Sequence, residues 1–128
     1  MLALLSGVVN AQSTVTVNIG TPPQWGPAGY TGAQYYYLPD VEAYYDVESS
    51  VFIYQSGGDW IYKTYLPRRY RNYDLFKGYK VTLTENSGNT PYLNYKAHKA
   101  KYAKGYHGQL QKNIGEQPIK GNFLSRIL

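Results

Sequence analysis

The alternation of apolar and polar residues is clearest between residues 33 and 66, where short Tyr-rich or β-branched runs are separated by turn signals. Alternation with a period of two is typical of strands that bury one face. Four short runs close together along the chain therefore predict a small antiparallel sheet. The expected strands cover residues 33–38, 41–47, 51–55 and 60–65.

The segments between these runs favour tight turns. Pro39-Asp40, Glu48-Ser49-Ser50 and Ser56-Gly57-Gly58-Asp59 stand at the three junctions, and glycine supplies the positive φ angles that tight hairpins need. Strands joined in this order predict a meander. Within 41–47, the alternation places one apolar series on one face, namely Val41, Ala43, Tyr45 and Val47, with Glu42, Tyr44 and Asp46 on the other.

The second half of the chain predicts one further strand and one helix. Residues 79–85 alternate, so that Tyr79, Val81 and Leu83 face one way and Lys80, Thr82 and Thr84 the other. The period then changes, and Thr90, Pro91 and Gly105 suit a helix N-cap, first turn and C-cap. We expect a helix over about 91–104, with Tyr92, Tyr95 and Tyr102 near one face.

The two ends of the chain differ from this middle part. Residues 1–11 combine an apolar run with Val9-Asn10-Ala11, which is typical of a signal peptide cleaved before Gln12. No basic residue precedes the run, so we expect the true start to lie upstream. The alternative is a buried N-terminal strand.

We therefore expect four regions, namely a signal peptide over 1–11, a Gly/Pro-rich segment over 12–32, a β-rich domain over 33–105 and a tail over 106–128. The Gly/Pro-rich segment contains a short strand over 13–19 and one large anchor, Trp25. The tail is expected to be mobile or to dock through its last apolar residues, 123–128. No stretch after residue 11 is long and apolar enough to cross a membrane.

Composition adds two constraints. The 128 residues include 16 Tyr against 3 Phe and 2 Trp. Because a Tyr ring carries a hydroxyl that needs water or a partner, this preference predicts half-exposed aromatic surfaces. The chain contains no Cys, which excludes disulfides, thiolate metal sites and cysteine nucleophiles.

Charge is divided along the chain. The first 59 residues contain five acidic and no basic residues, while the rest contain all 13 Lys and Arg. The basic and aromatic stretch 68–73, with the Lys-rich 96–104 segment, is the best binding candidate, because Arg and Tyr together bind anions and stack on flat ligands. Its candidate residues are Arg68, Arg69, Tyr70, Arg71 and Tyr73. The alternative is a basic loop paired with the acidic strands.

Other chemistry is poorly represented in the sequence. The acidic residues Asp40, Glu42, Asp46 and Glu48 could bind Ca²⁺ or act as an acid and base, but their spacing does not fit an EF-hand loop, and a solvent-facing strand edge explains them better. His98 and His107 share no helix face and are expected at the surface. No nucleophile elbow or phosphate-binding glycine loop is present. We therefore expect no enzyme, no cofactor and no metal site.

Several of these motifs together resemble an uncharacterised family of small tyrosine-rich exported proteins of Gram-negative bacteria. The resemblance covers about residues 25–104 and implies a periplasmic or secreted location, but it brings no activity and no binding residues. The missing basic start and the tail after Gly105 depart from the family pattern. The motifs are Tyr35-Tyr36-Tyr37-Leu38-Pro39-Asp40, Tyr44-Tyr45-Asp46, Phe52-Ile53-Tyr54, Gly57-Gly58-Asp59-Trp60, Leu66-Pro67, Arg69-Tyr70-Arg71-Asn72-Tyr73-Asp74-Leu75 and Gly78-Tyr79-Lys80-Val81.

The sequence as a whole predicts a mainly β (α+β) domain, a small antiparallel meander with one helix in its C-terminal half. The first functional hypothesis is a non-enzymatic envelope protein that binds or supports other envelope components. The second is a glycan- or anion-binding module that uses exposed Tyr and the basic half. Expected partners are an envelope glycan, an anionic lipid or an acidic protein surface; export argues against nucleic acid as a ligand.

Overall fold

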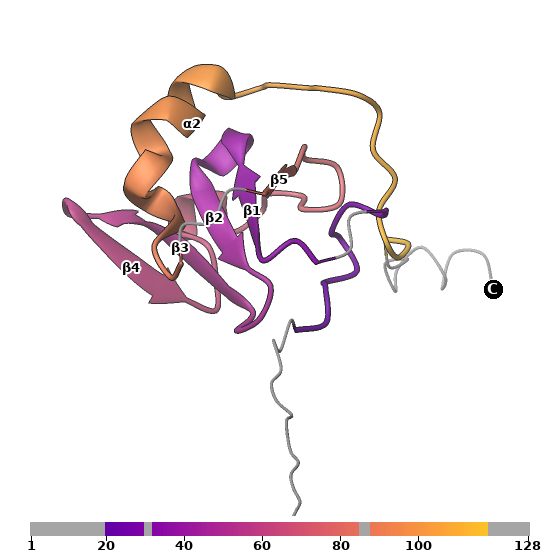
Figure 1. The fold of residues 1–128 in the computed structure, drawn as a ribbon, viewed down its shortest axis with the longest axis horizontal. Coiled ribbons are helices and arrows are strands. Elements are labelled where there is room, and N and C mark those ends of the chain that lie inside the picture. The colour runs from indigo at the N-terminus through magenta and orange to yellow at the C-terminus, as the bar shows by residue number, and fades with distance from the viewer. Residues whose placement is uncertain (1–19, 30–31, 85–87, 118–128) are drawn as a thin grey trace, which may run out of the picture.

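The computed structural model of the chain describes residues 20–29, 32–84 and 88–117. Three expectations lie outside these residues: the signal peptide 1–11, the strand 13–19 and the docking of the last apolar residues 123–128. The described chain forms one antiparallel sheet with a single helix against it (Figure 1), which confirms the mainly β (α+β) class.

The sheet has five strands in the order β4-β3-β2-β1-β5, and every neighbouring pair is antiparallel. The first four form the predicted meander, and β5 joins on the far side of β1 (Figure 1). The strands are β1 (Tyr35–Leu38), β2 (Ala43–Asp46), β3 (Val51–Ser56), β4 (Asp59–Lys63) and β5 (Val81–Leu83).

The turns follow the sequence with one difference. Gly57 and Gly58 have φ angles of 61° and 89° and join β3 to β4 as a two-residue hairpin, the backbone that two positive φ angles give. Between β1 and β2 the chain makes a short 3-10 helix, η1 (Pro39–Val41), instead of a tight turn, and Glu42 at its end has a φ of 50°. The predicted strand over 41–47 therefore begins only at Ala43.

One face of the sheet, called here the loop-covered face, carries the apolar series predicted along 41–47. Its buried residues are Tyr36, Leu38, Val41, Ala43, Tyr45, Val47, Phe52 and Tyr54. Irregular segments cover it. Trp25 packs edge-on against Tyr45, with ring centroids 4.7 Å apart, and is stacked on Phe52 at 6.1 Å, so the Gly/Pro-rich segment is held by its one large side chain, as predicted.

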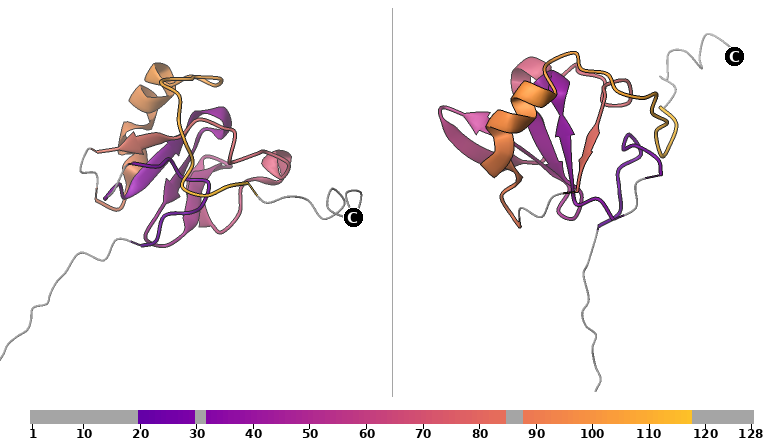
Figure 2. Two further views of the ribbon diagram at one scale, coloured as in Figure 1. Left: turned by 90° about the vertical axis from the view of Figure 1, so that its right-hand side faces the viewer. Right: turned by 45° about the horizontal axis from the view of Figure 1, so that its top comes forward.

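The opposite, helix-covered face is buried as well. Its buried residues are Tyr35, Tyr37, Tyr44, Ile53 and Leu83. A 3-10 turn, η3 (Pro91–Asn94), leads into α2 (Tyr95–Lys101), which lies across this face (Figure 2). Tyr92, Tyr95 and Tyr102 pack onto the sheet. The helix ends at Lys101, not at Lys104 as predicted, and Gly105 has its positive φ of 82° in the turn that follows.

Burial of both faces corrects the expectation of half-exposed tyrosines. Tyr36, Tyr37 and Tyr44 are among the largest fully buried side chains. That expectation assumes a sheet with one solvent-exposed face, which is common in small antiparallel sheets. Here irregular segments cover one face and a helix covers the other, so most Tyr rings of β1, β2 and β3 form the core.

Segments from the two ends of the described chain lie side by side near the loop-covered face (Figures 1 and 2). The backbone N–H of Ala28 donates to the carbonyl of Lys112 at 2.7 Å, and that of Ile114 donates to Gly26 at 2.8 Å. The 112–115 segment is therefore docked through its backbone. No helix in the described residues is long and apolar enough to span a membrane.

Candidate functional site

The basic loop begins where the polypeptide leaves the core. Leu66 packs against the loop-covered face and Pro67 is buried, and the 3-10 helix η2 (Arg68–Tyr70) follows. The N–H of Tyr70 donates to the carbonyl of Pro67 at 2.8 Å, and that of Tyr73 donates to Tyr70 at 2.9 Å. These turns direct the three arginines outward, and Arg68, Arg69 and Arg71 are all exposed.

Tyr73 fixes this loop to the sheet. Its hydroxyl donates to Oδ2 of Asp40 at 2.8 Å, and Oδ1 of Asp40 accepts the backbone N–H of Gly105 at 2.9 Å. Burial, with a further contribution from the Asp40 carboxylate, raises the pKa of Tyr73. Asp40 therefore meets the loop through a tyrosine and not through an arginine, and Tyr73 acts as an anchor.

Tyr70 is the point at which basic side chains from two distant segments converge. The Arg69 guanidinium carbon lies 4.9 Å from the Tyr70 ring centroid, and the Lys104 ammonium lies 5.6 Å from it. Nζ of Lys104, 34 residues away in the chain, also donates to the Tyr70 hydroxyl at 3.0 Å. The hydrogen bond from Lys104, and then the neighbouring Arg69, lower the pKa of Tyr70. Both cations thus share one aromatic ring.

We call Arg68, Arg69, Arg71 and Lys104, together with the Tyr70 ring, the Tyr70 surface. Chemically, it offers planar guanidinium groups that bind carboxylate, phosphate or sulfate in a bidentate manner. The half-buried ring limits the freedom of two of the cations through cation–π contacts. Of the residues predicted from the sequence, the structure brings Arg69 and Tyr70 together with Lys104, leaves Arg68 and Arg71 exposed beside them, and turns Tyr73 inward.

Two more lysines lie over the tyrosine rings at the start and just past the end of the helix. Lys99 is 5.6 Å from the Tyr95 centroid and Lys101 is 5.3 Å from that of Tyr102. The basic half of the chain therefore places its charge on the outer side of rings that pack inward.

The acidic residue Asp46 has a local role, because its Oδ1 accepts the N–H of Glu48 at 3.0 Å in the turn after β2. Among the described residues no cluster of acidic residues and histidines could hold a metal ion.

The sequence predicts His98 at the surface, and this prediction is wrong. Only 6% of its surface is exposed, and its Nδ1 lies 2.7 Å from the hydroxyl of Tyr44. The ring also stands 5.6 Å from the ring of Tyr37. His98 is three residues after Tyr95, so it shares the helix face that packs on the sheet, and this spacing is the signal that could have placed it. His107 is exposed, as predicted.

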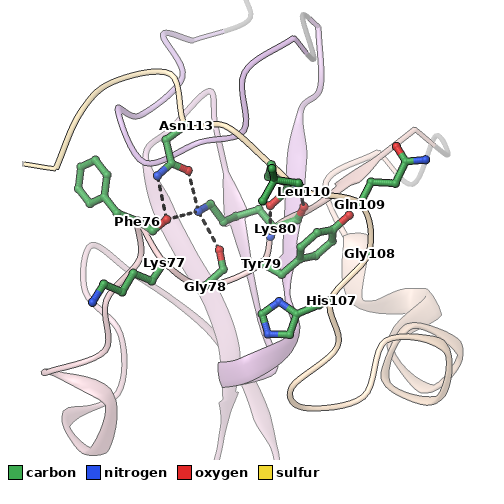
Figure 3. A pocket seen from close by; sticks show the side chains of 11 residues that line it. Phe76, Lys77, Gly78, Tyr79, Lys80, His107, Gly108, Gln109, Leu110 and Asn113 are labelled. Carbon is green, nitrogen blue, oxygen red and sulfur yellow. Dashed lines mark hydrogen bonds between the residues drawn. The ribbon is translucent and has the colours of Figure 1, made fainter.

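Lys80 is the second buried group that the sequence did not reveal. It is 2% exposed, and its ammonium donates to the carbonyl of Leu75 at 2.7 Å. It also donates to the carbonyl of Gly78 at 2.8 Å and to Oδ1 of Asn113 at 3.0 Å (Figure 3). Burial lowers the pKa of Lys80 to about 8. Beside it lies an open cavity of about 350 Å³ between the 76–80 and 107–113 segments.

This cavity offers little chemistry of its own. The Lys80 ammonium is already bound by oxygen atoms of Gly78 and Asn113 (Figure 3), and Tyr79 packs against Tyr106 and His107. The Tyr70 surface is therefore the better candidate. Comparisons of the chain with protein-family models, with curated proteins and with solved structures find no match.

Proposed function

We propose that the protein is a non-enzymatic, exported envelope protein that binds an anionic component of the envelope through the Tyr70 surface. The supporting observation is the convergence of Arg69 and Lys104 on Tyr70 from segments far apart in the chain. Holding like charges close together is unfavourable unless another interaction offsets it, and an anion lowers this repulsion when it binds. Export is supported by the signal-like residues 1–11 and by the resemblance to exported tyrosine-rich proteins.

The chemistry favours an acidic glycan, a phosphorylated lipid headgroup or an acidic protein surface. All three present carboxylate, phosphate or sulfate groups of the kind that arginine binds bidentately. Attraction by exposed cations depends on ionic strength, because salt screens such charges over about 8–10 Å. Binding through this surface is therefore expected to weaken as salt is added.

The test replaces Arg68, Arg69 and Arg71 together with Gln, and a control replaces Lys77, Lys96 and Lys112 with Gln. Both triple variants lose the same charge from exposed positions. A difference in binding between them therefore reports a local site and not the net charge. Binding to lipopolysaccharide, anionic phospholipid vesicles and acidic glycans is measured at low and at physiological salt. We expect at least about a tenfold loss for the arginine variant and a smaller loss for the control.

Equal losses of binding by the two variants would mean that the ligand responds only to the net charge of the protein. Unchanged binding by the arginine variant would refute the proposed site. The stability of the arginine variant should change by no more than about 0.5 kcal/mol, because the side chains are exposed.

Export is tested separately, by N-terminal sequencing of protein expressed with its natural upstream region. The expected first residue is Gln12, and cytosolic protein that retains Met1 would contradict export.

A further inference from the structure

Strand β4 forms one edge of the sheet. Within the described part of the chain it pairs with β3 alone, and no described segment lies beyond it in the direction of the sheet (Figure 1). An open edge exposes backbone N–H and C=O groups that can pair with another strand.

The hairpin register shows which groups face outward. Ser56 and Asp59 flank the two-residue Gly57-Gly58 turn, and such a flanking pair exchanges both backbone hydrogen bonds. Alternation along the ladder then directs the backbone groups of Asp59, Ile61 and Lys63 toward β3. The N–H and C=O groups of Trp60 and Tyr62 therefore point to the open edge.

The residue pattern of β4 is symmetric about its centre. Ile61 is flanked by the aromatic residues Trp60 and Tyr62, and these by an acid and a base, Asp59 and Lys63. We propose that β4 pairs in antiparallel fashion with β4 of a second copy, with the two Ile61 residues opposite each other. This register places each Asp59 opposite Lys63 of the other copy, and each Trp60 opposite Tyr62.

The backbone geometry agrees with the charge pattern. Trp60 and Tyr62 carry the outward groups, so their pairing provides four backbone hydrogen bonds, and the two Ile61 residues form the closer, non-hydrogen-bonded pair. An antiparallel register centred on Trp60 or Tyr62 loses the charge pairing. A parallel arrangement would place Asp59 against Asp59, which is unfavourable. Charge and backbone thus select the same register.

Exposed apolar surface gathers around this edge. Tyr62 is 46% exposed and Tyr65, three residues beyond it, is 60% exposed. Leu93, which follows the ring that stacks on Trp60, is 73% exposed. Side chains alternate along β4, so that Ile61 packs against the loop-covered face and Trp60 against the helix-covered face. A second copy at this edge would extend both aromatic cores across the interface and cover part of this surface.

The first measurement is the oligomeric state of the purified protein by sedimentation velocity, over concentrations from about 1 µM to 1 mM, the range expected for a short edge interface. Asp59→Lys and Lys63→Asp are compared with Glu48→Lys and Lys96→Asp, which make comparable charge reversals at exposed sites elsewhere. We expect dimers of the wild type and of both controls. Each β4 variant should dimerise at least about tenfold more weakly, because like charges now face each other.

Mixing the two β4 variants is the decisive step. One chain then carries lysine at both positions 59 and 63 and the other carries aspartate at both, so a heterodimer should form although each variant alone dissociates. Amide exchange gives a second readout, because the N–H groups of Trp60 and Tyr62 should become protected as the protein concentration rises. A wild type that stays monomeric, a mixture that does not associate, or dimers without this protection would each overturn the proposal.

Discussion

The two faces of the sheet are both rich in tyrosine, but they are covered in different ways. A helix covers one face, and the hydrogen bonds of its own turns pair part of its backbone. Irregular segments cover the other. Some of their backbone groups pair with each other, as Ala28 does with Lys112, and side chains supply further partners. Lys80 binds carbonyls of the 75–78 turn, Gln111 pairs with the backbone of Lys80, and Asp40 accepts from Gly105. The irregular cover thus depends on polar side chains as well as on the packing of Trp25, and the helical cover depends mainly on packing.

The largest expected effect concerns the anchor of the irregular cover. Trp25→Ala removes the ring that contacts Tyr36, Tyr45 and Phe52 and should lower the free energy of unfolding by about 3 kcal/mol. Trp25→Phe should recover more than half of this loss. Urea denaturation measures the loss, and hydrogen exchange shows where it acts.

If the two covers are independent, Trp25→Ala should speed amide exchange in 20–29 and 106–117 before it does so in α2 (Tyr95–Lys101). Equal acceleration in both covers would show that the two faces unfold together, and the difference between an irregular and a helical cover would not hold.

The next effect concerns Lys80 and pH. Its pKa is about 8 in the folded protein and about 10.4 in an unfolded chain. Between these values the unfolded state holds a proton that the folded state has released, so folding becomes more favourable as pH rises. The free energy of unfolding should rise by up to about 2–3 kcal/mol between pH 7 and 10, relative to the Lys80→Met variant.

Comparison with Lys80→Met is required because of buried tyrosines such as Tyr37, whose pKa is raised by burial. Above pH 10 these tyrosines lower the free energy of unfolding as pH rises, which opposes the effect of Lys80. Both proteins share that contribution, so the difference between them isolates the lysine. A difference that does not change with pH would mean that the Lys80 ammonium stays protonated throughout and that burial is not the dominant influence on it.

A smaller effect is expected for the hydrogen bond beneath the helix. Tyr44→Phe removes the hydroxyl that lies 2.7 Å from Nδ1 of His98 and leaves a buried ring nitrogen without that partner. A loss of about 1–2 kcal/mol is expected in thermal or urea unfolding. A double-mutant cycle with His98→Phe should return a coupling of about 1 kcal/mol. A coupling near zero would assign the loss to packing alone.

The smallest effect is expected for Tyr37 on β1, which pairs with Tyr44 of β2. The hydroxyl of Tyr37 is buried and has no hydrogen-bond partner among the described residues. Tyr37→Phe should therefore change stability by less than about 0.5 kcal/mol, or raise it slightly, because a buried polar group without a partner is unfavourable. It is matched to Tyr44→Phe in chemistry and burial, so a large loss at position 37 would disprove the claim that only one of these hydroxyls matters.

The sequence predicted the regular parts of this fold and missed the parts that depend on distant segments. The meander, the Gly57-Gly58 hairpin and the face shared by Val41 and Val47 follow from local patterns, so they could be predicted directly. The burial of Lys80 could not, because its partners include Asn113, 33 residues away, on a segment with no periodicity. The same holds for Lys104, whose contact with Tyr70 needs the turn after the helix.

The position of β5 has a consequence for folding kinetics. β1, β2, β3 and β4 meet their neighbours in chain order, whereas β5 pairs with β1, so that Tyr37 meets Val81 across a long intervening segment. Closing a long loop is slower than closing a hairpin, because more chain entropy is lost before contacts form. We expect pulse-labelled hydrogen exchange to protect the amides of the β3–β4 hairpin first and those of β5 last. The nascent sheet would then pass through a four-stranded stage in which β1 is a second open edge, available to any extended polypeptide until β5 arrives.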